Sequence, residues 1–187
     1  MTKRIAVVLF NLGGPDCPDA VQPFLFNLFN DPAIIQMPNP FRWLLARFIS
    51  ARRAPVAKKI YKHLGGKSPI LDLTEIQARA LEKNLETAGD VKCFIAMRYW
   101  HPMILETAER VRDFQPDEIV LLPLYPQFSG TTTGSSLKEW SKASAVVGLT
   151  VPTKSICCYP TDDGWIGAQV DLITKTLSEN DLGDDVR

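Results

Sequence analysis

An almost unbroken apolar run near the N-terminus limits the possible folds of this chain more than any other feature. The run is RIAVVLFN, from Arg4 to Asn11, and three of its eight residues are β-branched. A strand with one face in water alternates apolar and polar side chains, whereas a strand covered on both faces is apolar nearly throughout. The run therefore predicts a central strand of a parallel sheet with helices on both sides.

Further apolar runs alternate along the chain with stretches of helical period. This alternation is the signature of strand–helix units joined by right-handed crossovers. The sequence thus predicts an α/β fold with an open, doubly wound parallel sheet. The predicted strands span 4–11, 91–97, 118–124 and 150–159, and the predicted helices begin near 19, 74, 102, 135 and 164.

One helix start carries a specific signal. Thr74 is followed three residues later by Gln77, which is the pattern of a capping box. Gly89 provides a stop signal at the other end. We therefore expect a helix that begins at Thr74.

The segment from Asp31 to Gly66 contains helical pieces but no clear strand. Pro40 stands at a helix start, and an apolar face with two aromatic side chains follows it, ending in Arg52 and Arg53. One interpretation is a core helix. The other is an exposed lip that grips an apolar ligand or touches a membrane surface, because aromatic and basic residues are interleaved. The apolar face consists of Trp43, Leu44, Leu45, Phe48 and Ile49.

Composition excludes several classes of protein. The 187 residues carry a net charge of zero, so the chain has no broad attraction for nucleic acid, and we expect no nucleic-acid partner. Asn11 interrupts the first apolar run well before the length of a membrane span. The cysteines show no metal-binding spacing, and ordinary thiols are typical of a reducing compartment, so we expect a cytoplasmic protein without a metal centre. These cysteines are Cys17, Cys93, Cys157 and Cys158.

Unusual residues follow each predicted strand. The carboxyl ends of the strands lead into NLGG, RYWHP, YPQFSGTTTGSS and CCYPTDDGW. In an open parallel sheet, ligands bind at the carboxyl ends of the strands. The sequence therefore predicts a binding site at this edge.

Two of these stretches allow more than one interpretation. GTTTGSS could cradle a phosphate, but it lacks the Lys of a nucleotide loop, and helix capping by Ser and Thr explains the same composition. Arg98 at the end of a strand must find an anion or a carbonyl. His101 beside it is either a structural residue or a ligand, and Arg52 with Arg53 is either a solvated pair or an anion site.

Four stretches together resemble the ferrochelatases, which insert ferrous iron into a porphyrin in the last step of haem synthesis. They are NLGGPD, ARRAPVAKKIYKHLGGKSPI, AMRYWHP and YPQFSGTTTGSS, and their order and spacing match the family along about residues 4–164. The resemblance implies two similar doubly wound domains with the porphyrin in the cleft between them. Residues 1–178 would form the N-terminal domain, with a helical lip at about 31–66.

The resemblance also implies a set of porphyrin-binding residues. Arg53, and with it Arg52, would engage the porphyrin propionates, because guanidinium groups pair well with carboxylates. Leu12 falls where some members place a Tyr or Met beside the metal face, and Leu can contribute only packing there. Gly130 falls where animal members carry a cluster-ligating Cys, so no iron–sulfur cluster and no other cofactor is expected. The other expected contacts with the porphyrin are Tyr61, Ser68, Arg98, Tyr99 and Tyr125.

The catalytic residues of the family have no match in this sequence. The metal-handling His lies in a Ser-Ala-His motif expected just after Arg187, and its partner Glu lies further on. Residues 179–187 would then begin the connection to a C-terminal domain, which is the expected partner together with porphyrin and ferrous iron. We expect no catalytic residue and no activity in this chain alone. The alternatives are a chelatase for another tetrapyrrole, or a non-enzymatic module that binds a tetrapyrrole or a phosphorylated ligand.

Overall fold

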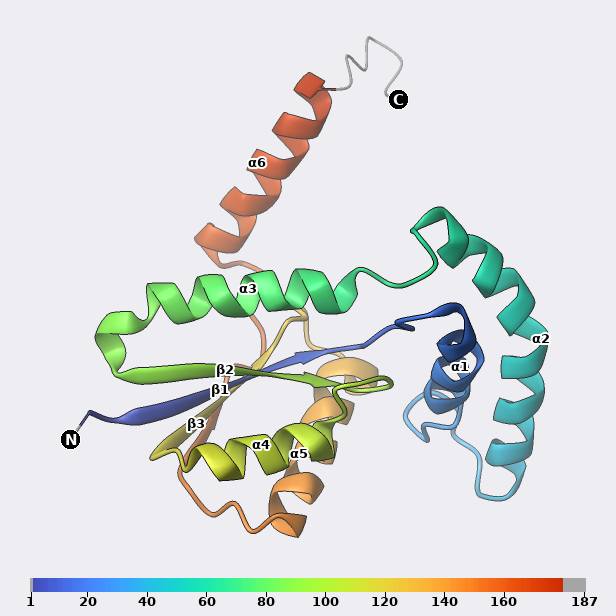
Figure 1. Cartoon of the computed structure of the whole chain (residues 1–187), viewed down its shortest axis with the longest axis horizontal. Helices are drawn as coiled ribbons and strands as arrows, with labels where there is room; N and C mark the ends of the chain where they lie inside the picture. The colour runs from blue at the N-terminus through green and yellow to red at the C-terminus, as the bar shows by residue number, and fades with distance from the viewer. Residues whose placement is uncertain (1, 180–187) are drawn as a thin grey trace.

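Four parallel strands form one sheet in the order β2-β1-β3-β4 (Figure 1). The computed structural model describes residues 2–179. Strands β1 (Arg4–Asn11) and β3 (Glu118–Pro123) are central, and β2 (Asp90–Met97) and β4 (Thr153–Ser155) are the edges. The predicted α/β fold with a parallel sheet is confirmed.

Helices cover both faces of the sheet. Helix α3 (Ile70–Asn84) lies on one face, while α4 (Ile104–Phe114) and α5 (Ser135–Val146) lie on the other (Figure 1). Short helical turns precede two of the main elements, at Pro18–Ala20 before α1 and Glu86–Ala88 before β2.

Strand β1 shows why the first apolar run is unbroken. Val8 and Phe10 pack on the side of α4 and α5, whereas Val7 and Leu9 pack on the side of α3. All four side chains are at most 4% exposed. Because burial of one such side chain stabilises a fold by roughly 1.5 to 3 kcal/mol, a polar residue on either face would be costly.

Helices α1 (Val21–Phe29) and α2 (Phe41–His63) form a separate pair beyond the carboxyl ends of the strands (Figure 1). Their shared apolar cluster includes Val21, Phe24 and the buried Tyr99, which follows β2. Tyr99 therefore joins the helix pair to the sheet. None of the helices within residues 2–179 is long and apolar enough to cross a membrane.

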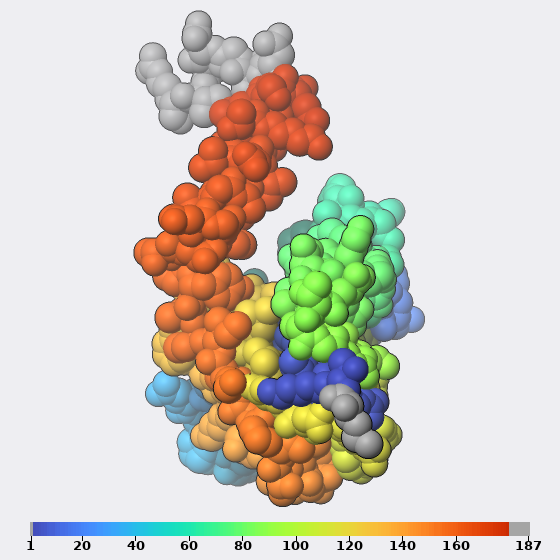
Figure 2. Space-filling model, turned by 90° about the vertical axis from the view of Figure 1, so that its left-hand side faces the viewer, coloured from blue at the N-terminus to red at the C-terminus, as the bar shows by residue number. Residues whose placement is uncertain are grey.

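Helix α6 (Asp163–Glu179) extends away from the sheet and its covering helices (Figures 1 and 2). It has no buried residue. Its exposed apolar side chains include Ile166, Val170, Leu172, Ile173 and Leu177. Most of the connection expected at 179–187 lies outside the described residues.

Two sequence-based predictions of element bounds are wrong. Helix α3 begins at Ile70, and Thr74 lies within it, where its buried hydroxyl donates to the Ile70 carbonyl at 2.6 Å. The same hydroxyl accepts from Asn11 at 3.1 Å, so it ties the helix to the sheet and does not cap it. The strand predicted at 150–159 is only three residues long, and the last backbone hydrogen bond to β3 runs from the Ile156 N–H to Leu121 at 2.9 Å.

Candidate functional site

Three of the four sequence motifs meet where β1 and β2 end. The backbone N–H of Arg98 donates to Asn11 at 2.9 Å, and that of Tyr99 donates to Leu12 at 3.0 Å. The N–H of Ser68 donates to Pro15 at 2.7 Å, which brings the GGKSP loop onto the NLGG loop. These loops form a rim at the carboxyl edge of the sheet, as the sequence predicts.

Two glycines allow this close approach. Gly13 has a φ of +85°, which L side chains rarely adopt, and a Cβ there would lie 3.0 Å from the backbone nitrogen of Trp100. A Cβ on Gly14 would lie 2.5 Å from the Ser68 side chain. The NLGG sequence is therefore required by contacts between loops.

A buried carboxylate organises the other side of the rim. Asp31 is only 4% exposed. Its Oδ2 accepts from Arg98 Nη2 at 2.6 Å, from the Tyr99 hydroxyl at 2.8 Å and from Ser135 Oγ at 3.1 Å. Its Oδ1 accepts from the Ala33 N–H at 2.8 Å, and Arg98 Nε also donates to Ser135, at 2.8 Å. One carboxylate thus links the loop after α1, the end of β2 and the start of α5.

The electrostatics of this cluster follow from burial and hydrogen bonding. Burial alone would raise the pKa of Asp31, but the Ala33 N–H, the Tyr99 hydroxyl and Arg98 together hold that pKa below its ordinary value. Burial, with the Asp31 charge, raises the pKa of Tyr99. Asp31 therefore remains ionised and Tyr99 remains neutral at pH 7.

Arg98 pairs with Asp31 in this cluster. The sequence predicts that Arg98 must meet an anion or a carbonyl, and the structure places it against Asp31 with a side chain only 16% exposed. Asp31 was missed because it lies 67 residues from Arg98 in the chain. A single sequence has no signal for such a pairing beyond the need of Arg98 for an anion.

Tyr125 lies near Arg98 but is not part of the Asp31 network. It is half-buried, and its hydroxyl is shielded from solvent without a hydrogen bond to any described residue. Burial raises the pKa of Tyr125 to about 12, and the positive charge of Arg98 acts in the opposite direction. Thr133 and Ser136, from the GTTTGSS stretch, also have buried hydroxyls without a partner among residues 2–179. Ser129 caps this turn by accepting from the Thr131 N–H at 3.3 Å.

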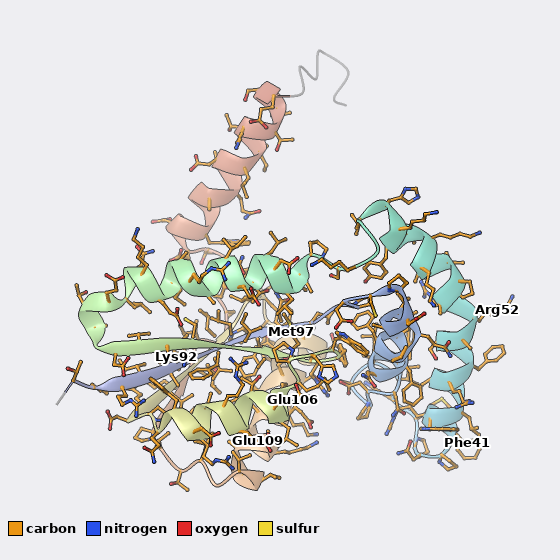
Figure 3. The ribbon with its side chains drawn as sticks, in the orientation of Figure 1. Phe41, Arg52, Lys92, Met97, Glu106 and Glu109 are labelled. Carbon is orange, nitrogen blue, oxygen red and sulfur yellow. The ribbon has the colours of Figure 1, made fainter. Side chains whose placement is uncertain are left out.

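The remaining predicted residues come from α2 and point in different directions. Tyr61 is half-buried in the cluster shared with Leu12 and Tyr99, and burial raises its pKa. Arg53 is exposed, with its guanidinium carbon 5.9 Å from the centre of the Phe29 ring. Arg52 is exposed on the side of α2 that faces away from the sheet (Figure 3). The structure therefore brings Leu12, Tyr61 and Tyr99 together and separates Arg52 from them.

Two hollows lie near these residues. A groove of about 540 Å³ runs between α1 and α2, and none of the predicted site residues lines it. A smaller cavity of about 300 Å³ includes Asp31, Arg98 and Ser135. The larger groove is lined by Asp19, Gln22, Pro23, Phe26, Trp43, Arg47, Ser50 and Lys58.

His101 contacts Glu106 at the start of α4. Its Nδ1 lies 2.8 Å from Glu106 Oε1, and Glu106 also accepts from the Met103 N–H at 2.9 Å (Figure 3 labels Glu106). Burial would raise the pKa of Glu106, but the Met103 N–H and His101 lower it overall. Within residues 2–179, no group of three or more His, Cys, Asp or Glu side chains is placed to hold a metal ion.

Comparison with known proteins identifies the family. The family model described as Ferrochelatase matches residues 4–187. The chain belongs to the ferrochelatase family. Ferrochelatases from Pelagibacter ubique, Caulobacter vibrioides and Hyphomonas neptunium are 54%, 56% and 56% identical to it over 93%, 94% and 92% of its length. The aligned part is 52%, 51% and 48% of those ferrochelatases, so the chain spans about half the length of these relatives.

Proposed function

We propose that this chain is the porphyrin-binding half of a ferrochelatase, which inserts Fe²⁺ into protoporphyrin IX or a related porphyrin to form haem. The family membership and the half-length match to ferrochelatases support the reaction class. The observation that carries the proposal is the rim, where the NLGG, GGKSP and RYW motifs contact one another at the ligand-binding edge of the sheet.

Insertion replaces the two N–H protons of the porphyrin by the iron. The reaction needs a bent macrocycle, a base for the protons and a route for the metal. Leu12 and Tyr61 are partly exposed and form an apolar surface suited to a flat ring, with the buried Tyr99 packed beneath them and Ser68 on the adjoining GGKSP loop. Exposed Arg53 is free of any carboxylate among the described residues and is the best candidate for a propionate. The base and the iron ligand would come from the second half of the protein.

Arg98 takes a different role in this proposal. Asp31 and Ser135 already accept from its Nη2 and Nε, so it supports the rim and does not bind a propionate. Tyr99 likewise supports the rim, because it is buried and its hydroxyl donates to Asp31. Tyr125 and its unpartnered hydroxyl would border the ring on the side of α5. Gly130 offers no thiolate, which favours an enzyme without an iron–sulfur cluster.

We further propose a cytoplasmic protein that touches a membrane at its periphery. Its cysteines within the described residues are free thiols, as a reducing compartment favours. The exposed aromatic and basic residues of α2 favour contact with a membrane surface.

Titration of the 187-residue chain with protoporphyrin IX tests the proposal. Quenching of tryptophan fluorescence should report saturable binding, while absorbance spectra with Zn²⁺ or Fe²⁺ should show no insertion. Addition of the second half of a related ferrochelatase should restore insertion, because it supplies the base and the metal ligand. Absence of porphyrin binding would contradict the proposal, and insertion by the chain alone would contradict the assignment of the chemistry to the other half.

A further inference from the structure

The two edges of the sheet differ in length. Strand β4 has three residues, whereas β2 has eight, and both are edge strands. The outer side of an edge strand presents backbone N–H and C=O groups that can pair with a strand of another chain. A three-residue edge is too short to pair well, so the long edge at β2 is the one that needs protection.

Strand β2 has the composition of a central strand although it lies at an edge. Its segment CFIAM, at positions 93–97, contains no charge, no Pro and no Gly. Ile95 and Met97 pack on the side of α3, while Phe94 and Ala96 pack on the side of α4. Short segments of this kind associate readily with other chains when their edge is open.

Alternate residues of β2 direct their backbone groups away from the sheet. The N–H of Asp90 donates to Lys3, and that of Arg98 donates to Asn11, both at 2.9 Å. Even-numbered residues of this segment therefore pair with β1 and the segment before it. Because the bonds of a parallel strand alternate between its two sides, the odd-numbered residues face outward. They are Val91, Cys93, Ile95 and Met97.

Side chains from the two flanking helices bond to the middle of this outer edge. The Cys93 N–H donates to Oε1 of Glu82, which comes from α3, at 2.7 Å. The Ile95 carbonyl accepts from Oγ1 of Thr107, which comes from α4, at 2.7 Å. One acceptor and one donor thus take the places that the C=O and N–H groups of an added strand would fill.

Glu82 and Thr107 differ in whether they can leave the edge. Thr107 is fully buried, whereas Glu82 is partly exposed. A hollow of about 410 Å³ runs along this edge, and Glu82, Cys93 and Ile95 all line it. The edge is therefore accessible from solvent, and the Glu82 side chain is the group that stands between the Cys93 N–H and an incoming strand.

We propose that Glu82 blocks the addition of a strand from a second copy of this chain to β2. Without the Glu82 carboxylate, the Cys93 N–H has no acceptor among the described residues and pairs with the partner copy. Two β2 edges related by a twofold axis meet antiparallel, so the same edge serves both copies. This inference concerns the sheet edge and does not depend on porphyrin binding.

Sedimentation velocity over a range of protein concentrations tests the proposal on the full chain. Glu82→Ala should associate at a concentration about tenfold below that of the wild type, because it leaves the Cys93 N–H unpaired. Glu82→Gln keeps an acceptor oxygen and should behave as the wild type. Glu75→Ala is the matched control, since Glu75 lines the same hollow but pairs with Arg79.

Three results would overturn the proposal. In the first, Glu82→Ala associates no more strongly than the wild type. In the second, Glu75→Ala associates as strongly as Glu82→Ala, so the effect is not specific to the edge contact. In the third, Glu82→Gln associates as strongly as Glu82→Ala, which would assign the effect to the charge and not to the hydrogen bond.

Hydrogen exchange locates the contact. In dilute Glu82→Ala the Cys93 amide should exchange about tenfold faster than in the wild type, while β1 keeps its wild-type exchange rates. At concentrations where the variant associates, β2 should become protected and α6 should not. Protection gained at α6 alone would place the association elsewhere and overturn the proposal. Faster exchange throughout β1 would show that Glu82 supports the whole fold and would also overturn it.

Discussion

The Asp31 cluster and helix α2 differ in whether their charged side chains are paired within the protein. At the cluster, one buried carboxylate receives four hydrogen bonds and neutralises Arg98. On α2, Arg52 and Lys59 are exposed and have no ion pair with any described residue. A fully paired buried group fixes the positions of the elements around it, whereas unpaired surface cations are available to a partner. Arg98 and Arg52 are both cationic, yet Arg98 is already paired with Asp31 whereas Arg52 is available to a partner. A positive charge alone therefore does not identify a ligand-binding residue.

The largest expected effect comes from removing the centre of the cluster. Asp31→Ala leaves Arg98 buried without its partner, and the loss of one member of a buried ion pair costs about 3 to 5 kcal/mol. Urea unfolding should show this loss, with a smaller one for Asp31→Asn, which keeps an acceptor. Asp19→Ala is the matched control, because the Asp19 side chain is 98% exposed although it pairs with Lys58 at 3.1 Å. Similar losses for Asp31→Ala and Asp19→Ala would show that the cluster does not hold the rim.

Lowering the pH should reduce the free energy of unfolding by a smaller amount. The pKa of Asp31 in the folded protein lies below its ordinary value of 3.8, so its ionised form stabilises the fold at neutral pH. This contribution is fully present above pH 3.8 and should be lost as the pH falls from there through the pKa of the folded state. Glu118 behaves in the same way, because its hydrogen bonds with Lys154 and Lys3 hold its pKa at about 2.

Unfolding followed by circular dichroism between pH 5 and pH 2 would measure this loss. Asp31→Asn should make the acid dependence shallower, while Glu118→Gln should reduce the remainder. An acid dependence that is unchanged by Asp31→Asn would contradict the account of the cluster.

The sequence predicted the parts of the fold that depend on local pattern. The unbroken run at Arg4–Asn11 indicated a strand covered on both faces, and the rule for parallel sheets placed the NLGG and RYW motifs at one edge. Of the residues expected from the family resemblance, Leu12 and Tyr99 follow β1 and β2 at this edge, whereas Tyr61 joins their cluster from α2. Local periodicity and sheet topology were sufficient to place the motifs at this edge, whereas the choice of individual porphyrin-binding residues rests on the family resemblance and stays a prediction.

The features that the sequence did not predict depend on tertiary contacts. Thr74 has the local pattern of a helix start, yet its hydroxyl is used within α3 because Asn11 reaches it from β1. From the sequence alone, the aromatic residues of α2 could form either a core face or an exposed face. The structure decides between these two, because α2 packs against α1 and buries the side with Ala46 and Ser50. Asp31 joins residues 67 and 104 positions away, which no local pattern indicates.

Paired substitutions at Arg53 and Arg98 test the central claim most directly. Each variant, Arg53→Lys and Arg98→Lys, would be measured for protoporphyrin affinity and for the free energy of unfolding. Arg98→Lys should lower stability by about 1 to 3 kcal/mol, because an ammonium group cannot reproduce the paired Nε and Nη2 contacts with Ser135 and Asp31. Arg53→Lys should keep stability within about 0.5 kcal/mol and weaken porphyrin binding several-fold. The opposite pattern would contradict the account. In that pattern Arg53→Lys lowers stability, while Arg98→Lys keeps wild-type stability and loses porphyrin affinity.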